Sequence, residues 1–409
     1  MADGPRLTLL GKLIIARFVL GCFFGAWYLW PRGNTSGGPS GGPAAGPQAG
    51  TASGPAAPYT GPVTELGIAY GTEKENWLKW AAAEFAKTDD GGKITVNLIP
   101  KGSLEGGQAV WRDEDKRIHV WSPASSLYRD VLVQEWQPKH GNNPILKEES
   151  LALSPMVFVF WDQRYKAFVE KYKAVSFGTI HDALAEQGGW DAIAKQPDWG
   201  VFKFGHTHPN QSNSGLVTLV LMAYSYHNKK ENETLEMKDI LDPKFQDWME
   251  GLERGVHRMS NSTGNMMKDM VRYGPSTYDA LFVYENVVID YLKNAEGRWG
   301  ALQVVYPRHN AWNDNPYYVL DVPWSTKDQR RAAEVFLQYL MSERVQKEAL
   351  AHGFRPGNTS IPIRDVADSP FVLYEKAGLK LEPNQVCAPP KAEVISNLLN
   401  VWERRVGKR

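Results

Sequence analysis

Cysteine is nearly absent from this chain of 409 residues, and neither sign of charge dominates it. The two cysteines, Cys22 and Cys387, lie near opposite ends of the sequence, so no framework of disulfides holds a fold together. The 46 Lys and Arg residues balance 46 Asp and Glu residues, whereas binding to nucleic acid needs clustered positive charge. These shortages exclude a disulfide-stapled scaffold and argue against a nucleic-acid partner.

The sequence also lacks the short motifs of common catalytic and metal sites. It has no HExxH, no CxxC and no GxSxG elbow between a strand and a helix. His206 and His208 could ligate a metal together with Glu285, but paired histidines more often have backbone partners, and we expect both in an exposed loop. We therefore predict no metal and no cofactor. Ser212 or Ser214 beside these histidines leaves a surface serine hydrolase as an alternative, although nothing identifies an orienting acid or an oxyanion hole.

One long apolar run, residues 13–30, is broken only by Arg17. Eighteen such residues nearly span a bilayer, and the excess of Lys and Arg on its N-terminal side keeps that side cytoplasmic. We predict a cytoplasmic N-terminus (1–12), a single transmembrane anchor (13–30), a disordered Gly/Pro-rich tether (31–62) and a body outside the cytoplasm. A cleaved signal peptide and lipidation at Cys22 stay open as alternatives.

From residue 63 onward, strand-like runs alternate with helical ones. The first block consists of strands 63–70, 93–99 and 117–121 and helices 73–87, 104–111 and one from 123. A second block follows the apolar run 151–161, with strands near 201–204, 281–284 and 302–306, before strand 317–320 and a helical stretch at 327–351. Such alternation predicts parallel sheets with helices on both faces and ligands at the carboxyl ends of the strands.

Hydroxyl and amide side chains gather where these strands lead into helices. The richest joint follows strand 201–204: Ser212 or Asn213 can cap the next helix, and Ser214 opens its first turn. Four other joints share this design, with Thr72, Ser103 and Ser122 expected at the cap positions of three of them, and together they predict a binding site for a small polar ligand. Glu285, at the end of another strand, is either a charge stabilised by a helix N-terminus or a contact to a ligand amine or hydroxyl. The candidate ligand-binding residues from these joints are Thr72, Ser103, Ser122, Ser125, Asn213, Ser214, Thr263 and Glu285.

Several longer segments carry a family resemblance: SPASSLYRD, PNQSNSGL, GPSTYDALFVYEN, YPRHNAWNDNPYYVLDVPW and the stretch from Gln329 through GFRPGN. Over about residues 63–363 the chain resembles bacterial extracellular solute-binding proteins of the type 2 periplasmic-binding fold. It looks most similar to the anchored branch related to molybdate and sulfate binders. Some relatives in that branch carry a von Willebrand type A domain; we expect none in this sequence, since no DxSxS run is visible in it.

The resemblance implies an α/β fold of two doubly wound lobes joined by two crossover strands, near 151–161 and 302–320. Lobe 1 would be discontinuous (63–155 and 310–409), and lobe 2 would cover 156–309. The oxyanion-binder pattern falls on Thr72, Ser103, Ser214, Thr263 and Tyr284. Glu285 departs from it, because oxyanion binders tend to have a small neutral residue there.

We therefore predict a membrane-tethered, non-enzymatic protein that closes two lobes over a small polar ligand, with an oxyanion among the candidates, for uptake or sensing. Its predicted partners are the membrane and either an ABC-transporter permease or another membrane protein. Besides the hydrolase, a sensor or assembly protein that kept the fold and lost the ligand remains an alternative.

Overall fold

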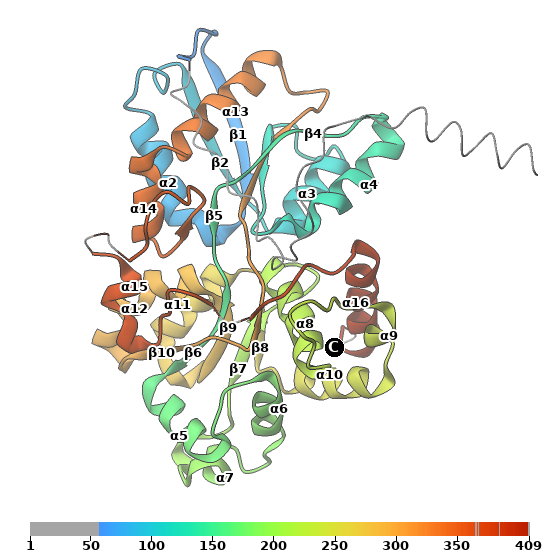
Figure 1. Ribbon diagram of the computed structural model, residues 1–409, viewed down its shortest axis with the longest axis vertical. Helices are drawn as coiled ribbons and strands as arrows, with labels where there is room; N and C mark the ends of the chain where they lie inside the picture. The colour runs from blue at the N-terminus through green and yellow to red at the C-terminus, as the bar shows by residue number, and fades with distance from the viewer. Residues whose placement is uncertain (1–56, 365, 367, 384, 408–409) are drawn as a thin grey trace, which may run out of the picture. The chain divides into compact units, whose positions relative to one another are not determined.

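The computed structural model describes residues 57–364, 366, 368–383 and 385–407 (Figure 1). The predicted cytoplasmic segment, the anchor and most of the tether lie outside these residues. Within the described ranges, no helix is long and apolar enough to cross a membrane. The α/β fold predicted from the sequence is confirmed, with two five-stranded sheets.

Lobe 1 is built on a sheet with the strand order β2-β1-β3-β12-β4. Strand β1 pairs in parallel with β2 and β3, whereas β12 is antiparallel to β3 and β4, so this sheet is mixed rather than purely parallel. Its strands are β1 (Thr64–Tyr70), β2 (Ile94–Pro100), β3 (Val120–Ser122), β4 (Ile145–Ser150) and β12 (Pro316–Leu320). Its helices are α2 (Glu75–Phe85), α3 (Ser103–Trp111), α4 (Arg129–His140), α13 (Lys327–Leu340) and α14 (Glu343–Ala351).

Lobe 2 repeats this mixed design with the order β10-β6-β9-β7-β8. Its strands are β6 (Met156–Trp161), β7 (Phe204–Thr207), β8 (Arg258–Ser260), β9 (Ala280–Tyr284) and β10 (Leu302–Val305). Its helices are α5 (Asp162–Tyr172), α6 (Phe177–Ala185), α7 (Trp190–Ala194), α8 (Asn213–Tyr226), α9 (Met237–Ile240), α10 (Pro243–Gly255), α11 (Thr263–Tyr273) and α12 (Glu285–Trp299). Strand β7 is parallel to β8 and β9, so their carboxyl ends share one edge.

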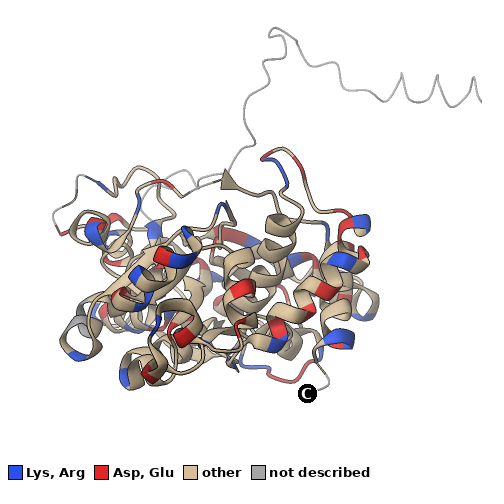
Figure 2. Ribbon diagram, turned by 90° about the horizontal axis from the view of Figure 1, so that it is seen from below, with Lys and Arg blue, Asp and Glu red and all other residues tan. Residues whose placement is uncertain are grey.

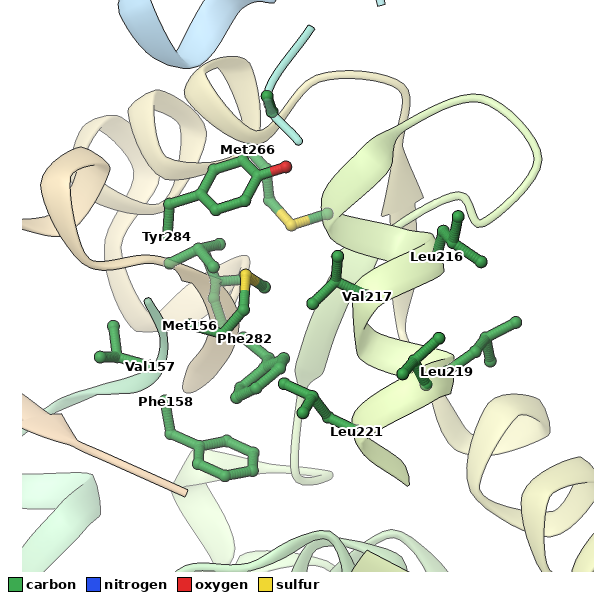
Figure 3. Close-up of a cluster of buried hydrophobic side chains, with 14 of the residues drawn as sticks. Met156, Val157, Phe158, Leu216, Val217, Leu219, Leu221, Met266, Phe282 and Tyr284 are labelled. Atoms are coloured by element: carbon green, nitrogen blue, oxygen red, sulfur yellow. The ribbon is translucent and has the colours of Figure 1, made fainter. Parts of the chain in front are cut away.

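Helix α8 lies at the centre of the lobe 2 core because nearly every one of its residues is apolar or small. Residues 213–224 are all buried, which matches a helix that is hydrophobic around its whole circumference. Figure 3 shows Val217 and Leu221 of α8 directed toward Phe158 and Phe282 of the sheet. This packing fixes the N-terminus of α8 at the carboxyl edge of β7.

The chain connects the two sheets more than twice. Strands β4 and β6 are joined through β5 (Ala152–Leu153), and β10 leads to β12. In addition, β13 (Arg355–Pro356) pairs with β5, and the following segment reaches β14 (Gln385–Val386), which pairs with β11 (His309–Asn310). Helix α16 (Ala392–Arg405) then packs against α8, α9 and α10. The prediction that places all of 310–409 in lobe 1 is therefore wrong for this last helix.

Charged residues of both signs are interspersed over the helices that Figure 2 shows. The chain carries equal numbers of the two signs, 46 each. In that view, neither colour covers a continuous face, as a broad electrostatic footprint would require.

Candidate functional site

The loops at the carboxyl ends of the strands contact one another between the two sheets. Thr72 Oγ1 of lobe 1 lies 2.9 Å from Ser262 Oγ of lobe 2, and Asn286 Nδ2 donates to the backbone oxygen of Glu73 at 3.0 Å. A Cβ on Gly102 would lie 2.8 Å from the backbone oxygen of Gln211. We call this region the interlobe junction and define it as residues 72–74, 122–128, 212–214, 262–263, 284–286 and 313–315.

Three hydroxyls of lobe 2 form one hydrogen-bonded cluster at the junction. Ser214 Oγ lies 2.5 Å from Thr207 Oγ1 and 2.6 Å from Thr263 Oγ1. The cluster joins the end of β7 to the first turns of α8 and α11, and all three side chains are buried. Helix α8 can start this close to β7 because residue 215 is a glycine. The Cβ of any other residue at this position would lie 2.3 Å from the backbone oxygen of Thr207. The two candidates Ser214 and Thr263 are thus brought together.

Asn213 connects this cluster to the chain crossing between the lobes. Its Nδ2 donates to Tyr284 OH at 2.9 Å and to Asn313 Oδ1 at 3.0 Å. Its Oδ1 is buried and has no hydrogen-bond partner in the described part of the chain. Burial, with the negative charge of Glu73 as the next cause, holds the pKa of Tyr284 well above its usual value. The phenol is therefore neutral and can donate as well as accept.

Lobe 1 contributes a buried ion pair that the sequence analysis missed. Lys74 is fully buried, and its Nζ lies 2.5 Å from Glu73 Oε1, 3.1 Å from Pro123 O and 3.2 Å from Asn315 Oδ1. Burial lowers the pKa of Lys74, and the charge of Glu73 offsets this only in part. A signal was present in the sequence: position 74 shares an inward helical face with the buried Trp77 and Leu78.

Of the predicted serines of lobe 1, two accept hydrogen bonds from the backbone and one has no hydrogen-bond partner in the part of the chain that the structure describes. Ser103 Oγ accepts from the backbone nitrogen of Ala124 at 3.0 Å, and Ser125 Oγ accepts from that of Leu127 at 3.2 Å. By contrast, Ser122 Oγ is fully buried and lacks a partner among the described residues, as does the hydroxyl of Tyr128, which the sequence analysis did not single out. Ser103 and Ser125 therefore shape the loop, while Ser122 and Tyr128 have unused hydrogen-bonding capacity.

The capping roles differ from those predicted. Thr72 and Ser103 are the first residues of their helices rather than caps, and Ser122 precedes the turn that Ser125 caps. Ser212 occupies the cap position of α8, but its side chain makes no capping bond. The hydroxyls of Thr72 and Ser122 are thus not engaged by the first turn of a helix.

Glu285 is engaged away from the hydroxyl cluster. Its carboxylate accepts from Arg355 through Nε and Nη2, both at 2.9 Å, and from the hydroxyl of Tyr306. The side chains of Glu285 and Arg355 are both buried. Arg355 comes from β13, so this pair ties the start of α12 to the third connection between the sheets. Of the two interpretations of Glu285, this geometry favours a structural charge.

The expectation that His206 lies in an exposed loop is wrong. His206 belongs to β7 and is fully buried, with Nε2 3.1 Å from Glu253 Oε1 and Nδ1 donating to the backbone oxygen of Thr207 at 2.8 Å. Burial lowers the pKa of His206, but the charge of Glu253 and the hydrogen bonds to Glu253 and to the Thr207 oxygen together outweigh it, so the net pKa is raised. His208 is partly buried and packs its ring against Trp402 of α16. In the described ranges, no three His, Cys, Asp or Glu side chains are grouped to hold a metal ion.

Sequence comparison assigns the family. The model of the family described as bacterial extracellular solute-binding protein matches residues 66–355, and the chain therefore belongs to this family. The resemblance predicted from the motifs is confirmed, and the comparisons offer no support for the serine hydrolase. No curated protein matches the chain by sequence.

Solved structures share the fold at low identity. The sulfate-binding protein SubI from Mycobacterium tuberculosis H37Rv has 15% identity and a TM-score of 0.51, with 84% of this chain and 99% of that chain covered. A periplasmic thiamin binding protein has 12% identity and a TM-score of 0.56, with 84% and 96% covered. Maltose-bound MalE3 of T. maritima has 12% identity and a TM-score of 0.55, with 84% and 95% covered.

Proposed function

We propose that the chain is a membrane-tethered solute-binding protein whose two lobes close over a small polar ligand at the interlobe junction. The observation that carries this proposal is a set of buried polar atoms without partners in the described part of the chain. Ser122 Oγ and Tyr128 OH come from lobe 1, and Asn213 Oδ1 comes from lobe 2. Atoms from both lobes therefore have hydrogen-bonding capacity that a single ligand between them can use.

The energetics support a ligand-driven closure. A buried polar atom without a partner costs about 1–3 kcal/mol relative to a paired one. A ligand that pairs such atoms in the closed arrangement, but not in an open one, shifts the equilibrium toward closure by its differential contacts. Thr72, Ser214, Thr263 and Tyr284 are the remaining contacts in this proposal, since each can exchange its present bond for one to the ligand.

The other candidates take supporting roles in the proposal. Ser103 and Ser125 hold the lobe 1 loop through bonds to backbone nitrogens, and Glu285 is left out because Arg355 occupies its carboxylate. The N–H groups at the first turns of α8 and α11 suit an oxyanion, whereas the charges of the junction and the acceptor atoms left free among its described residues favour a ligand with hydrogen-bond donors. Uptake through an ABC-transporter permease, or delivery to another membrane protein, would use the closed, ligand-bound state.

The test is release of a small molecule from the purified full chain. Mass spectrometry after denaturation should find a compound that also raises the melting temperature when it is added back and is not turned over. Tyr128→Phe, which removes one unpaired hydroxyl and keeps the ring, should weaken that response. Turnover of the compound, or no ligand-dependent change with any released molecule, would refute the proposal.

The proposed anchor has its own test. The full chain should stay in the membrane fraction after alkaline washing, and protease added outside the cell should cut within residues 31–62. Release of a mature protein that lacks residues 1–30 would refute the anchor, and lipid labelling lost in Cys22→Ala would favour the lipoprotein alternative.

A further inference from the structure

The unpaired amide oxygens at the interlobe junction are acceptors by necessity. Asn286 Nδ2 donates to the backbone oxygen of Glu73, which can only accept, so Asn286 Oδ1 must be the free atom. Asn313 Nδ2 donates to the backbone oxygen of Ser154 at 3.0 Å, so Asn313 Oδ1 faces Asn213 and requires its Nδ2. The free atom of Asn213 is therefore also an oxygen. Both are buried and need a hydrogen-bond donor.

Glu73 adds a charged acceptor to this set. Lys74 donates to its Oε1, whereas no described residue donates to its Oε2. The side chain of Glu73 is 7% exposed. Its negative charge raises the pKa of Tyr284 on the other lobe, so the carboxylate lies within electrostatic reach of that phenol. Glu73 Oε2 thus has capacity for a donor, and the backbone of Glu73 contacts Asn286 of lobe 2 at the same junction.

The charges of the junction do not favour an added anion. Among its residues as defined above, Lys74 is the one cation, and Glu73 already neutralises it. Asp314 is a second acid near Lys74, and burial raises its pKa. The carboxylate of Glu285 is matched by Arg355. A fully ionised oxyanion offers only acceptors, so it would leave Asn213 Oδ1 and Asn286 Oδ1 unpaired and add like charge beside Glu73.

We propose that the ligand presents N–H or O–H donors, as ammonium and polyhydroxyl compounds do, and that Glu73 is the residue that discriminates between these and inorganic oxyanions. The proposal rests on the proposed function of the junction and specifies the chemistry of what it binds. The hydroxyls of Ser122 and Tyr128 accept or donate, so they fit either kind of ligand. The selectivity instead comes from Glu73, Asn213 and Asn286, which can only accept at their free oxygens.

A ligand panel on the full chain in detergent tests the proposal. The probes are ethanolamine, putrescine and glycine as ammonium compounds, glycerol and glucose as hydroxyl compounds, and sodium sulfate, phosphate and molybdate, all at matched ionic strength. We expect at least one ammonium or hydroxyl compound to raise the melting temperature and no oxyanion to do so. Stabilisation by an oxyanion, or by none of the donor compounds, overturns the inference.

The two proposals fail in different ways. If sulfate, phosphate or molybdate binds and Tyr128→Phe weakens it, the binding function of the junction stands and the donor inference falls. If no probe changes the melting temperature and no small molecule is released on denaturation, the proposed function itself falls.

Glu73→Gln identifies the kind of donor. This change keeps one acceptor oxygen and removes the charge. It also leaves the buried Lys74 without its charged partner and should lower stability, so affinity is measured where urea titration shows the variant to be folded. There it should weaken an ammonium ligand by at least about tenfold and a hydroxyl ligand by less than about threefold, because hydrogen bonds to charged groups are the stronger ones. Glu75→Gln is the matched control: it removes the same charge two residues away, from a partly exposed carboxylate bonded to Lys79, and should leave affinity unchanged. Equal effects of the two variants, or no effect of Glu73→Gln on any ligand, would refute the role of Glu73.

Discussion

Replacing Ser122 by alanine should separate ligand binding from stability. Its Oγ is fully buried at the end of β3, and no described residue pairs with it. An unpaired buried hydroxyl costs about 1–3 kcal/mol, and alanine removes that cost together with a single oxygen. The cavity left by one atom offsets part of the gain. The free energy of unfolding of Ser122→Ala should therefore stay the same or rise by about 1 kcal/mol.

Ser125→Ala is the matched control for this substitution. Ser125 lies three residues further along the same loop, and its Oγ accepts from the backbone nitrogen of Leu127 at 3.2 Å. Removing such a cap typically costs about 1 kcal/mol of stability. The same chemical change should thus destabilise the protein at one position and not at the other.

Ligand affinity should fall in Ser122→Ala and stay nearly unchanged in Ser125→Ala. If Ser122 Oγ bonds the ligand in the closed state, losing this neutral bond costs about 0.5–1.5 kcal/mol of binding free energy. The dissociation constant then rises roughly 2- to 13-fold. Ser125→Ala should change affinity by less than twofold. Urea unfolding of the free proteins and calorimetric titration with the ligand released from the wild type measure both quantities. Lowered stability with unchanged affinity in Ser122→Ala would show that its hydroxyl has a structural role and would refute the reasoning.

Three further outcomes follow from buried groups. Because the net pKa of His206 is raised, the stability from its ion pair is complete below about pH 6.5 and is lost as pH rises through the folded-state pKa. Urea titrations at a series of pH values should show that wild type loses stability relative to His206→Gln as pH rises through this pKa. A difference in unfolding free energy that stays constant with pH would contradict the prediction. Glu285→Gln should cost about 3–5 kcal/mol in chemical denaturation by leaving Arg355 buried without its partner, and a cost under about 1 kcal/mol would indicate a solvated pair. Gly215→Ala should cost about 1–3 kcal/mol because its Cβ would lie 2.3 Å from a backbone oxygen, whereas Gly264→Ala, at 3.5 Å, should be nearly neutral in the same measurement.

The α/β fold could be predicted because its signals are local. Strand β1 (Thr64–Tyr70) falls within the predicted run 63–70, and β9 (Ala280–Tyr284) covers the predicted strand 281–284. In each case a short apolar run ends at a polar joint, and both the run and the joint are visible within about ten residues. The same locality placed Ser214 at the first turn of α8, and it placed Thr263 at the joint where α11 begins.

The partners of these residues could not be predicted, because they come from distant parts of the chain. Arg355 pairs with Glu285 across 70 positions, and Lys74 reaches Asn315 across 241. The predicted strand 201–204 stops short of His206, whereas β7 runs on to Thr207 and the imidazole contacts Glu253 of the distant helix α10. Pairings of this kind decide whether a polar side chain is structural or available to a ligand.

The difference between structural and available groups determines which residues at the junction can recognise a ligand. Thr72, Ser214 and Thr263 already have hydroxyl partners, so a ligand gains from them only the difference between two similar bonds. Ser122 Oγ and Asn213 Oδ1 have no partner among the described residues, so a ligand that bonds them gains the whole free energy of the new hydrogen bond. Selectivity should therefore depend more on these unpaired atoms and on Glu73 than on the hydroxyl cluster. A family pattern gives the positions of polar residues but not their hydrogen-bond partners, so it treats the bonded hydroxyls and the unpaired atoms alike. The class of ligand is therefore better inferred from the buried polar atoms that have no partner among the described residues.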